Sequence, residues 1–336
     1  MQHFAYDDHL NVFRLPVGWV CVFESVHPSF VHSKLLFPSL SLDTSPKPIF
    51  QLNQAILTPN LPTKQYLVNR VPGGPLDPTY FADYDGIMQA CLGTGAYCII
   101  DIHNYARWDG NVIGQGGPSN DEFASVWSQL AQAYAGQSNV IFGLMNEPHD
   151  LDINMWADTL QAAVNGIRNA GATSQLILLP GINYGAVGGF DSSSGPALSA
   201  VQDTDGSKDK LIFDMHQYLD YDTSGGNPEC VTDQTANLGY QADYLRSTGR
   251  QAFLTETGGG NTDSCVQYMC SQLAYLNNNA DVYLGWVGWA AGWFPFPWPW
   301  RPYSRNQLKP TTCVQGLSIP TASSVRCPTE PQTPCL

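Results

Sequence analysis

The chain has 336 residues, with 15 lysines and arginines against 29 aspartates and glutamates, which gives a formal net charge of −14. A hydrophobic fraction of 43% is enough for a sizeable core and excludes a disordered chain. The negative charge argues against nucleic acid as a partner, and no apolar run approaches the ~20 residues of a membrane span.

Two segments differ in composition from the rest of the chain. Residues 20–64 and 294–336 hold 15 of the 24 prolines but only 3 of the 29 acidic residues. The remainder is an acidic, proline-poor body. We therefore look for the fold and the function in that body.

The acidic body alternates short apolar runs with longer helix-like stretches. In chain order the runs are Val12–Trp19, Tyr97–His103, Val140–Glu147, Gln175–Gly181, Leu211–Tyr218, Gln251–Thr257 and Val282–Trp289. Four of them are almost continuously apolar. That pattern indicates strands buried on both faces, as in a parallel sheet covered by helices.

Helical signals lie between these runs. The predicted helices are Tyr80–Leu92, Asp121–Ala135, Ile153–Ala170, Asn237–Ser247 and Asp263–Leu276. Ser119 or Asn120 can cap the second helix, and Gly171 can end the third. The alternation indicates the α/β class. An open doubly wound sheet is one solution, but chemically active residue types cluster after nearly every run, which favours a (β/α)8 barrel.

Two glutamates follow predicted strands. Glu147 comes directly after Val140–Leu144, and Glu256 comes after Gln251–Phe253. Strand ends at the mouth of a barrel converge on one cleft. A pair of carboxyl groups, one protonated and one ionised, is what cleavage of a glycosidic bond requires. The alternative for each glutamate is that it caps the next helix.

Other polar residues at the strand ends fit the same chemistry. Arg14 can hold the charge of a nucleophilic carboxylate and keep its pKa low, although a structural ion pair is its ordinary role. The remaining candidates can orient substrate or the carboxylates: His103, Asn146, His216 and Tyr218. Trp108, Trp289 and Trp293 can form platforms for sugar rings, although a buried tryptophan is more often part of a core. Neither a metal-ligand motif nor a serine-hydrolase elbow is present, so we expect no metal and no cofactor.

Four segments together resemble a known family. Phe13–Trp19, Asp101–Trp108, Met145–Asp150 and Leu254–Gly260 look like the fungal endo-β-1,4-glucanases of glycoside hydrolase family 5, in the same order along the chain. The similarity spans about residues 1–19 and 65–292. Any one segment is moderately specific, whereas all four in order are highly specific.

The resemblance implies a (β/α)8 barrel that cleaves internal β-1,4 bonds of cellulose with retention of configuration. By motif, Glu147 matches the acid/base and Glu256 the nucleophile, with their carboxyl groups ~5 Å apart. The supporting positions that it implies are Arg14, His103, Asn104, Asn146, His216, Tyr218 and Trp289. It also pairs Cys91 with Cys98 and Cys230 with Cys265, and leaves the partner of Cys270 open. We expect an extracellular monomer that acts on cellulose or a related β-glucan, since disulfides agree with secretion.

The chain departs from the family in three places. It begins in the helix that follows the first family strand, so we expect one barrel strand and any secretion signal to be absent. We interpret residues 20–64 as an insertion after the second strand, encoded by a retained intron. The alternative is a genuine lid or binding loop. Residues 293–336 form an irregular, proline-rich tail, which leaves 1–292 as the catalytic barrel.

These departures lead to a further expectation and to alternative functions. A barrel without one strand has two unpaired edges, so we expect the chain as written to be poorly soluble or inactive. Other readings are a β-mannanase or mixed-linkage β-glucanase on the same barrel, or an inactive carbohydrate-binding relative. An unrelated α/β binding protein is the last alternative.

Overall fold

A computed structural model describes residue 1 and residues 10–18, 67–68 and 70–289 of the chain. Its main sheet has seven parallel strands: β1 (Val12–Val17), β2 (Tyr97–Ile102), β5 (Val140–Gly143), β6 (Ile177–Pro180), β7 (Leu211–Tyr218), β8 (Ala252–Gly258) and β9 (Tyr283–Gly288). The strands are ordered in space as they are in the chain. Each of the seven predicted runs overlaps one of these strands, and β8 extends one residue past its run, to Gly258.

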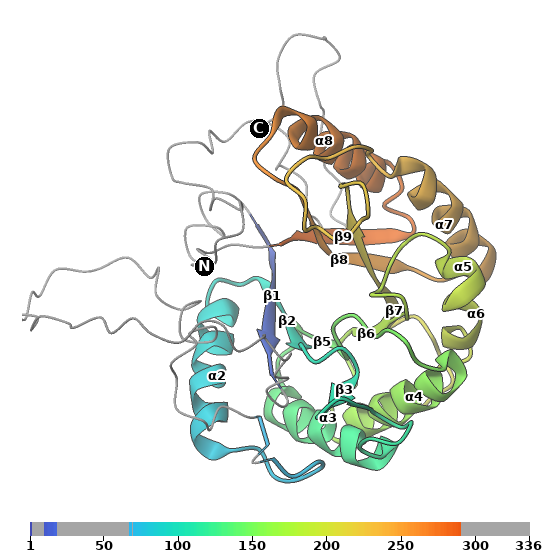
Figure 1. Cartoon of the computed structure of the whole chain (residues 1–336). Coiled ribbons are helices and arrows are strands. Elements are labelled where there is room, and N and C mark those ends of the chain that lie inside the picture. The colour runs from blue at the N-terminus through green and yellow to red at the C-terminus, as the bar shows by residue number, and fades with distance from the viewer. Residues whose placement is uncertain (2–9, 19–66, 69, 290–336) are drawn as a thin grey trace, which may run out of the picture.

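Helices surround the strands and complete a nearly closed α/β barrel (Figure 1). The long helices are α2 (Pro78–Leu92), α3 (Asn120–Tyr134), α4 (Ile153–Asn169), α7 (Thr235–Thr248) and α8 (Asp263–Asn278), and each matches a predicted helix. The sequence did not predict the short helices α5 (Phe190–Ser193) and α6 (Gly195–Leu198), nor the hairpin of β3 (Arg107–Trp108) and β4 (Asn111–Val112). Among the described residues, no helix has the length and apolar character needed to cross a bilayer.

The barrel has a seam between its first and last described strands. Some Cα atoms of β1 and β9 lie within 8 Å of each other, but among the described residues no ladder of hydrogen bonds joins the two strands. Among the described strands, β1 and β9 are therefore the two edges of the sheet. The predicted insertion at 20–64 and the predicted tail at 293–336 lie outside the described residues.

A small cluster of buried apolar side chains lies inside the barrel. Six neighbouring strands supply one buried residue each: Val12, Ile99, Ile141, Leu178, Ile212 and Phe253. Side chains two positions apart on a strand face the same side of the sheet. The residues two positions later therefore also point inward, and four of them are polar or charged: Arg14, Asp101, Asp214 and Thr255. This alternation stacks a polar layer on top of an apolar plug.

A helix cap and two disulfides stabilise elements around the barrel. Ser119 is the N-cap of α3, where its hydroxyl accepts from the backbone of Glu122 and the Glu122 carboxylate accepts from the backbone of Ser119. Both disulfides implied by the resemblance are present. Cys91–Cys98 joins the end of α2 to β2, and Cys230–Cys265 joins the loop after β7 to the first turn of α8. These links brace the ends of elements that frame the barrel.

Replacing Ser119 by alanine removes one side of this reciprocal cap. We expect Ser119→Ala to lower the free energy of unfolding by about 1 kcal/mol, because the backbone N–H of Glu122 at the start of α3 loses its acceptor. Urea unfolding followed by circular dichroism measures the change. Ser174→Ala, in the exposed turn before β6, is the matched control and should change stability by a few tenths of a kcal/mol at most. Equal effects of the two substitutions would contradict the cap.

Candidate active site

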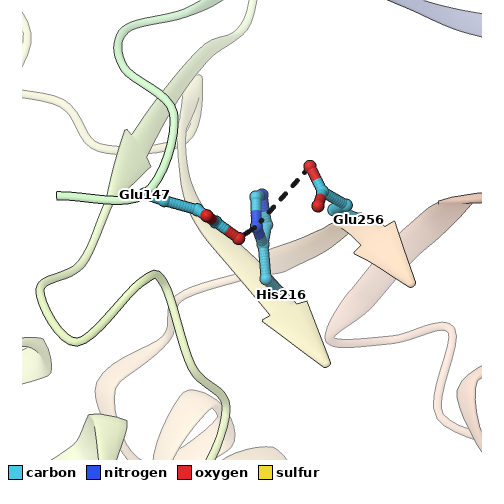
Figure 2. A group of neighbouring side chains, drawn as sticks. All are labelled: Glu147, His216 and Glu256. Carbon is cyan, nitrogen blue, oxygen red and sulfur yellow. Dashed lines mark hydrogen bonds and ion pairs between the residues drawn. The ribbon is translucent and has the colours of Figure 1, made fainter. Parts of the chain in front are cut away.

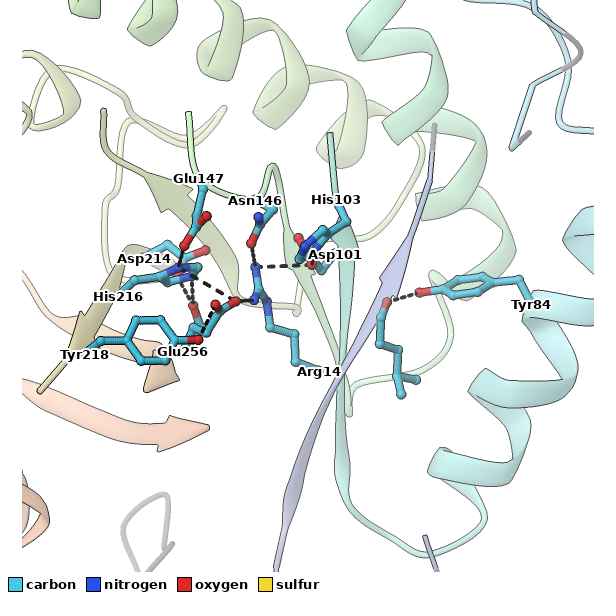
Figure 3. Close-up of polar contacts among 12 residues, drawn as sticks. Arg14, Tyr84, Asp101, His103, Asn146, Glu147, Asp214, His216, Tyr218 and Glu256 are labelled. Atoms are coloured by element: carbon cyan, nitrogen blue, oxygen red, sulfur yellow. Dashed lines mark hydrogen bonds and ion pairs between the residues drawn. The ribbon is translucent and has the colours of Figure 1, made fainter. Parts of the chain in front are cut away.

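Arg14 lies at the centre of the polar layer inside the barrel (Figure 3). Its Nη1 donates to Glu256 Oε2 at 2.5 Å, and its Nη2 donates to Asn146 Oδ1 at 2.6 Å. Nη2 also lies 3.2 Å from Asp101 Oδ2. Only 2% of the Arg14 side chain is exposed. Burial lowers the pKa of Arg14, but the charges of Asp101 and Glu256 outweigh it and raise the pKa, so the guanidinium stays charged.

Glu256 is held as a carboxylate by the residues around it. Besides the bond from Arg14, its Oε1 accepts a hydrogen bond from the Tyr218 hydroxyl at 2.6 Å. Burial favours the neutral acid, but the nearby charges of His216 and Arg14 and the Tyr218 hydrogen bond prevail and lower the pKa of Glu256. Burial and the charge of Glu256 in turn raise the pKa of Tyr218 well above its usual range, so its hydroxyl remains a donor.

Glu147 faces Glu256 across His216 (Figure 2). His216 Nδ1 lies 2.9 Å from Glu147 Oε1 and 3.8 Å from Glu256 Oε2. One ligand atom from each of the three residues lies within 4.8 Å of the other two. The Glu147 side chain is 18% exposed, compared with 8% for Glu256. The two carboxylates are therefore close together but differ in their partners and in their access to solvent.

The backbone at Glu147 has an uncommon conformation. Asn146 continues the strand hydrogen bonding, since its N–H donates to the Ile102 carbonyl at 2.9 Å. Glu147 then has φ +47°, in the left-handed region that side-chain-bearing residues rarely occupy. This turn sends Asn146 toward Arg14 and Glu147 toward His216 (Figure 3). Such outliers cluster at functional sites.

A row of aromatic rings extends from this cleft. Trp289 stacks on His103 with ring centroids 5.5 Å apart, and His103 meets Tyr105 edge-on at 5.7 Å. Tyr105 meets His149 at 6.1 Å, and His149 stacks on Tyr184 at 4.4 Å. The Tyr184 side chain is more than half exposed. The row joins partly buried rings to a solvent-exposed ring.

Most of the predicted site residues lie in this one network. Six of them are linked directly by hydrogen bonds or ion pairs: Arg14, Asn146, Glu147, His216, Tyr218 and Glu256. His103 joins them through Asp101, because His103 Nδ1 lies 2.9 Å from Asp101 Oδ2 and Asp101 lies beside Arg14. Trp289 is connected through its stacking on His103. Asn104 is fully buried beside them, with its N–H donating to the Ile102 carbonyl. Trp108 is buried, and Trp293 lies outside the described residues.

Three site residues were not predicted from the sequence: Asp101, Asp214 and Thr255. Asp101 and Asp214 are nevertheless visible in the sequence as charged residues inside apolar strand runs. A charge at such a position needs a buried partner. Thr255 carries no comparable signal, because threonine is ordinary in a strand.

The cluster of Glu147, His216 and Glu256 also has the donor types that a divalent cation uses. However, Glu256 is already bound by Arg14 and Tyr218, and His216 Nδ1 faces Glu147. A cation would have to compete with the Arg14 guanidinium for the same carboxylate. The arrangement therefore fits acid–base chemistry better than metal chemistry.

Comparisons with known proteins agree with this arrangement. The family model for cellulase (glycosyl hydrolase family 5) matches residues 56–292. Endoglucanase EG-II of Hypocrea jecorina is 50% identical over 296 residues, which cover 88% of this chain and 60% of that protein. The chain thus spans about three fifths of the length of this relative.

Solved structures share the fold. The crystal structure of Cel5A (EG2) from Hypocrea jecorina has a TM-score of 0.74 and 48% identity, with 89% of this chain and 78% of that chain covered. The structure of XacCel5A in complex with cellopentaose has a TM-score of 0.69 and 30% identity, with 88% of this chain and 82% of that chain covered.

Removing the charge of Arg14 tests the electrostatics of the cluster. We expect Arg14→Met to raise the pKa of Glu256 by about 1–3 units, because the carboxylate loses its main cationic partner. Carbon NMR of the labelled carboxyl groups during a pH titration measures the shift. Since the folded pKa is depressed, the ionised Glu256 stabilises the native protein above its unfolded pKa, and that contribution is lost as the pH falls through the folded pKa.

The matched control is Arg246→Met. Arg246 pairs with Asp281 at 2.7 Å, but its side chain is 41% exposed. We expect this substitution to leave the titration of Glu256 unchanged. A Glu256 titration that is the same in Arg14→Met as in the original chain would contradict the role of Arg14.

Proposed function

The chain belongs to the cellulase family of glycosyl hydrolases, family 5, and from this membership we propose that it is an endo-β-1,4-glucanase acting with retention of configuration. The observation that carries the proposal is the spacing of Glu147 and Glu256, whose nearest carboxylate oxygens lie within 4.8 Å. Retaining enzymes have carboxyl groups ~5 Å apart, whereas inverting enzymes leave room for water at about 6.5–9.5 Å.

The different surroundings of the two glutamates support their roles. Glu256 is ionised and buried beside Arg14 and Tyr218, so it acts as the nucleophile on the anomeric carbon. Glu147 is more exposed and faces it, so it donates a proton to the departing glycosidic oxygen. In the second step Glu147 takes a proton from water, which then attacks the glycosyl–Glu256 ester and releases the sugar.

The aromatic row supports a polymeric substrate. Rings from Trp289 to Tyr184 offer successive apolar faces beside the carboxylates, and sugar rings have apolar faces that pack on aromatics. We infer that the substrate is cellulose or a related β-glucan, as in the relative whose structure holds cellopentaose. The two disulfides support secretion of the chain, which we propose to act as an extracellular monomer without a cofactor.

Activity of the 336-residue chain is the first test. Site residues from β1 and from β8 are joined across the barrel, so we expect the chain to release reducing ends from carboxymethyl cellulose. A soluble, folded chain without activity would count against the proposed function, whereas an insoluble chain would agree with the unpaired edges of the open barrel. Products from cellulose, glucomannan and lichenan separate a β-1,4-glucanase from a mannanase or mixed-linkage β-glucanase.

Neutralising either carboxylate should abolish turnover. We expect Glu147→Gln and Glu256→Gln each to reduce kcat on cellopentaose by at least about a thousandfold, because one loses the proton donor and the other the nucleophile. Binding of cellopentaose, measured by calorimetry, should persist. Glu122→Gln is the control, since glutamine also serves the cap of α3. Substantial activity in either variant would refute its assigned role.

The exposed end of the aromatic row should contribute to substrate binding. We expect Tyr184→Ala to raise KM for a long cellooligosaccharide about five- to tenfold with little change in kcat, because a stacking contact distant from the bond that is cleaved is lost. Tyr240→Ala removes a similarly exposed tyrosine from α7 and should leave KM unchanged. The same KM in both variants would place the substrate elsewhere.

A further inference from the structure

A buried chain of polar groups continues behind the acid/base glutamate. Its members are Asp214 and His216 on β7, Thr255 on β8 and Glu147 after β5. We propose that Asp214, acting through Thr255, is a positioning residue that fixes which nitrogen of His216 carries the proton and so keeps Glu147 able to act as the acid. This inference rests on the proposed function.

The contacts run without a break from Asp214 to Glu147. The Thr255 hydroxyl donates to Asp214 Oδ1, and His216 Nε2 lies 3.1 Å from Thr255 Oγ1. The other ring nitrogen, Nδ1, lies 2.9 Å from Glu147 Oε1. Asp214 and Thr255 are almost wholly buried, so bulk water does not replace these bonds. Figure 3 shows Asp214 next to His216 within this group of polar side chains.

A β-bulge makes this arrangement possible. The pairing of β7 with β8 changes register, so that Met215 lies opposite Leu254 but His216 lies opposite Glu256. Thr255 is therefore the extra residue on β8. In a regular strand Thr255 and Glu256 would face opposite sides of the sheet. The bulge lets both face the barrel interior, where Glu256 reaches Arg14 and Thr255 reaches Asp214.

The direction of the hydrogen bonds decides the state of His216. A hydroxyl has a single proton, so while Thr255 donates to Asp214 its oxygen can only accept from His216. Nε2 must then carry a proton. In the neutral ring Nδ1 is left as an acceptor, which matches a protonated Glu147. If Thr255 instead donated to Nε2, a neutral His216 would carry its proton on Nδ1 and would stabilise the Glu147 carboxylate.

Several charges act on this chain of groups. Four charged or titratable residues face His216 or Asp214: Arg14 from β1, Asp101 from β2, Glu256 from β8 and Glu147 after β5. Tyr218 lies beside Glu256. Burial lowers the pKa of His216, but Glu256 and Glu147 outweigh it and raise the pKa. Burial raises the pKa of Asp214 itself, against the opposing charges of His216 and Arg14, and the ionised form of Asp214 adds to the pKa of His216, with Oδ1 at 4.0 Å from Nε2. A negative charge on Asp214 raises the pKa of His216, whose Nδ1 faces Glu147.

The test is the pH profile of kcat/KM for Asp214→Asn in the full chain. We expect its alkaline limb on cellopentaose to move down by about one pH unit, because the pair loses a nearby negative charge and the direction of the Thr255 hydroxyl is no longer fixed. At a pH above that limb, activity should fall about tenfold. With a dinitrophenyl β-cellobioside, whose leaving group needs no proton, kcat/KM should change less than twofold.

Variants of Thr255 and a second aspartate separate positioning from stability. Thr255→Val should shift the profile like Asp214→Asn, whereas Thr255→Ser retains the hydroxyl and should behave like the original chain. Asp203→Asn breaks another buried pair, in which Asp203 Oδ2 lies 2.8 Å from Arg168 Nε. It should lower stability without moving the profile.

Nitrogen NMR of the His216 imidazole gives a readout that needs no turnover. We expect a proton on Nε2 in the original chain and a shift toward Nδ1 protonation in Asp214→Asn. An unchanged tautomer together with an unchanged alkaline limb in Asp214→Asn and Thr255→Val would overturn the proposal. If the original chain had no activity, the proposed function would fail, and the tautomer would still decide the role of Asp214.

Discussion

The site depends on one buried cation. Arg14 is enclosed inside the barrel and bonded to Glu256 and Asn146, with Asp101 at 3.2 Å. Taking a guanidinium out of water costs several kcal/mol, and only well-placed carboxylates offset that cost. Removing one partner of such a pair typically costs about 3–5 kcal/mol. The same interaction that makes Arg14 tolerable in the interior therefore keeps Glu256 ionised, so stability and reactivity are coupled at this residue.

The regular alternation of the strands supplies this cluster, and one irregularity completes it. Val12, Ile99, Ile212 and Phe253 form part of the apolar plug, and the residues two places later form the polar layer. Strict alternation would have turned Glu256 toward the helices. Because the register changes between Met215 and His216, Glu256 turns inward to Arg14 instead. The bulge is thus a requirement of the site and not a defect of the sheet.

The contrast between regular strands and the bulge at Thr255 explains what could be predicted from the sequence. Buried strands leave continuous apolar runs, and residues at their ends stand out, so the strands, the long helices, Glu147 and Glu256 were all predicted. The bulge at Thr255 leaves no mark in composition or periodicity, because Gln251–Thr257 reads as an ordinary strand. The partners of Asp214 follow from the register and therefore required the structure. The short hairpin of β3 and β4 was missed for a related reason, since strands of two residues have no measurable period.

Two identical side chains acquire different chemistry here through their partners. Glu256 receives hydrogen bonds from a permanent cation and a phenol, which favour only its charged form. Glu147 instead meets His216, a group that can either accept or donate at Nδ1. An acid/base catalyst must hold a proton in one step and lack it in the next, so a partner that serves both states suits it better than a fixed cation. In the proposed mechanism His216 does this only while Thr255 and Asp214 hold its Nε2, so this buried pair helps to separate the proposed roles of the two glutamates.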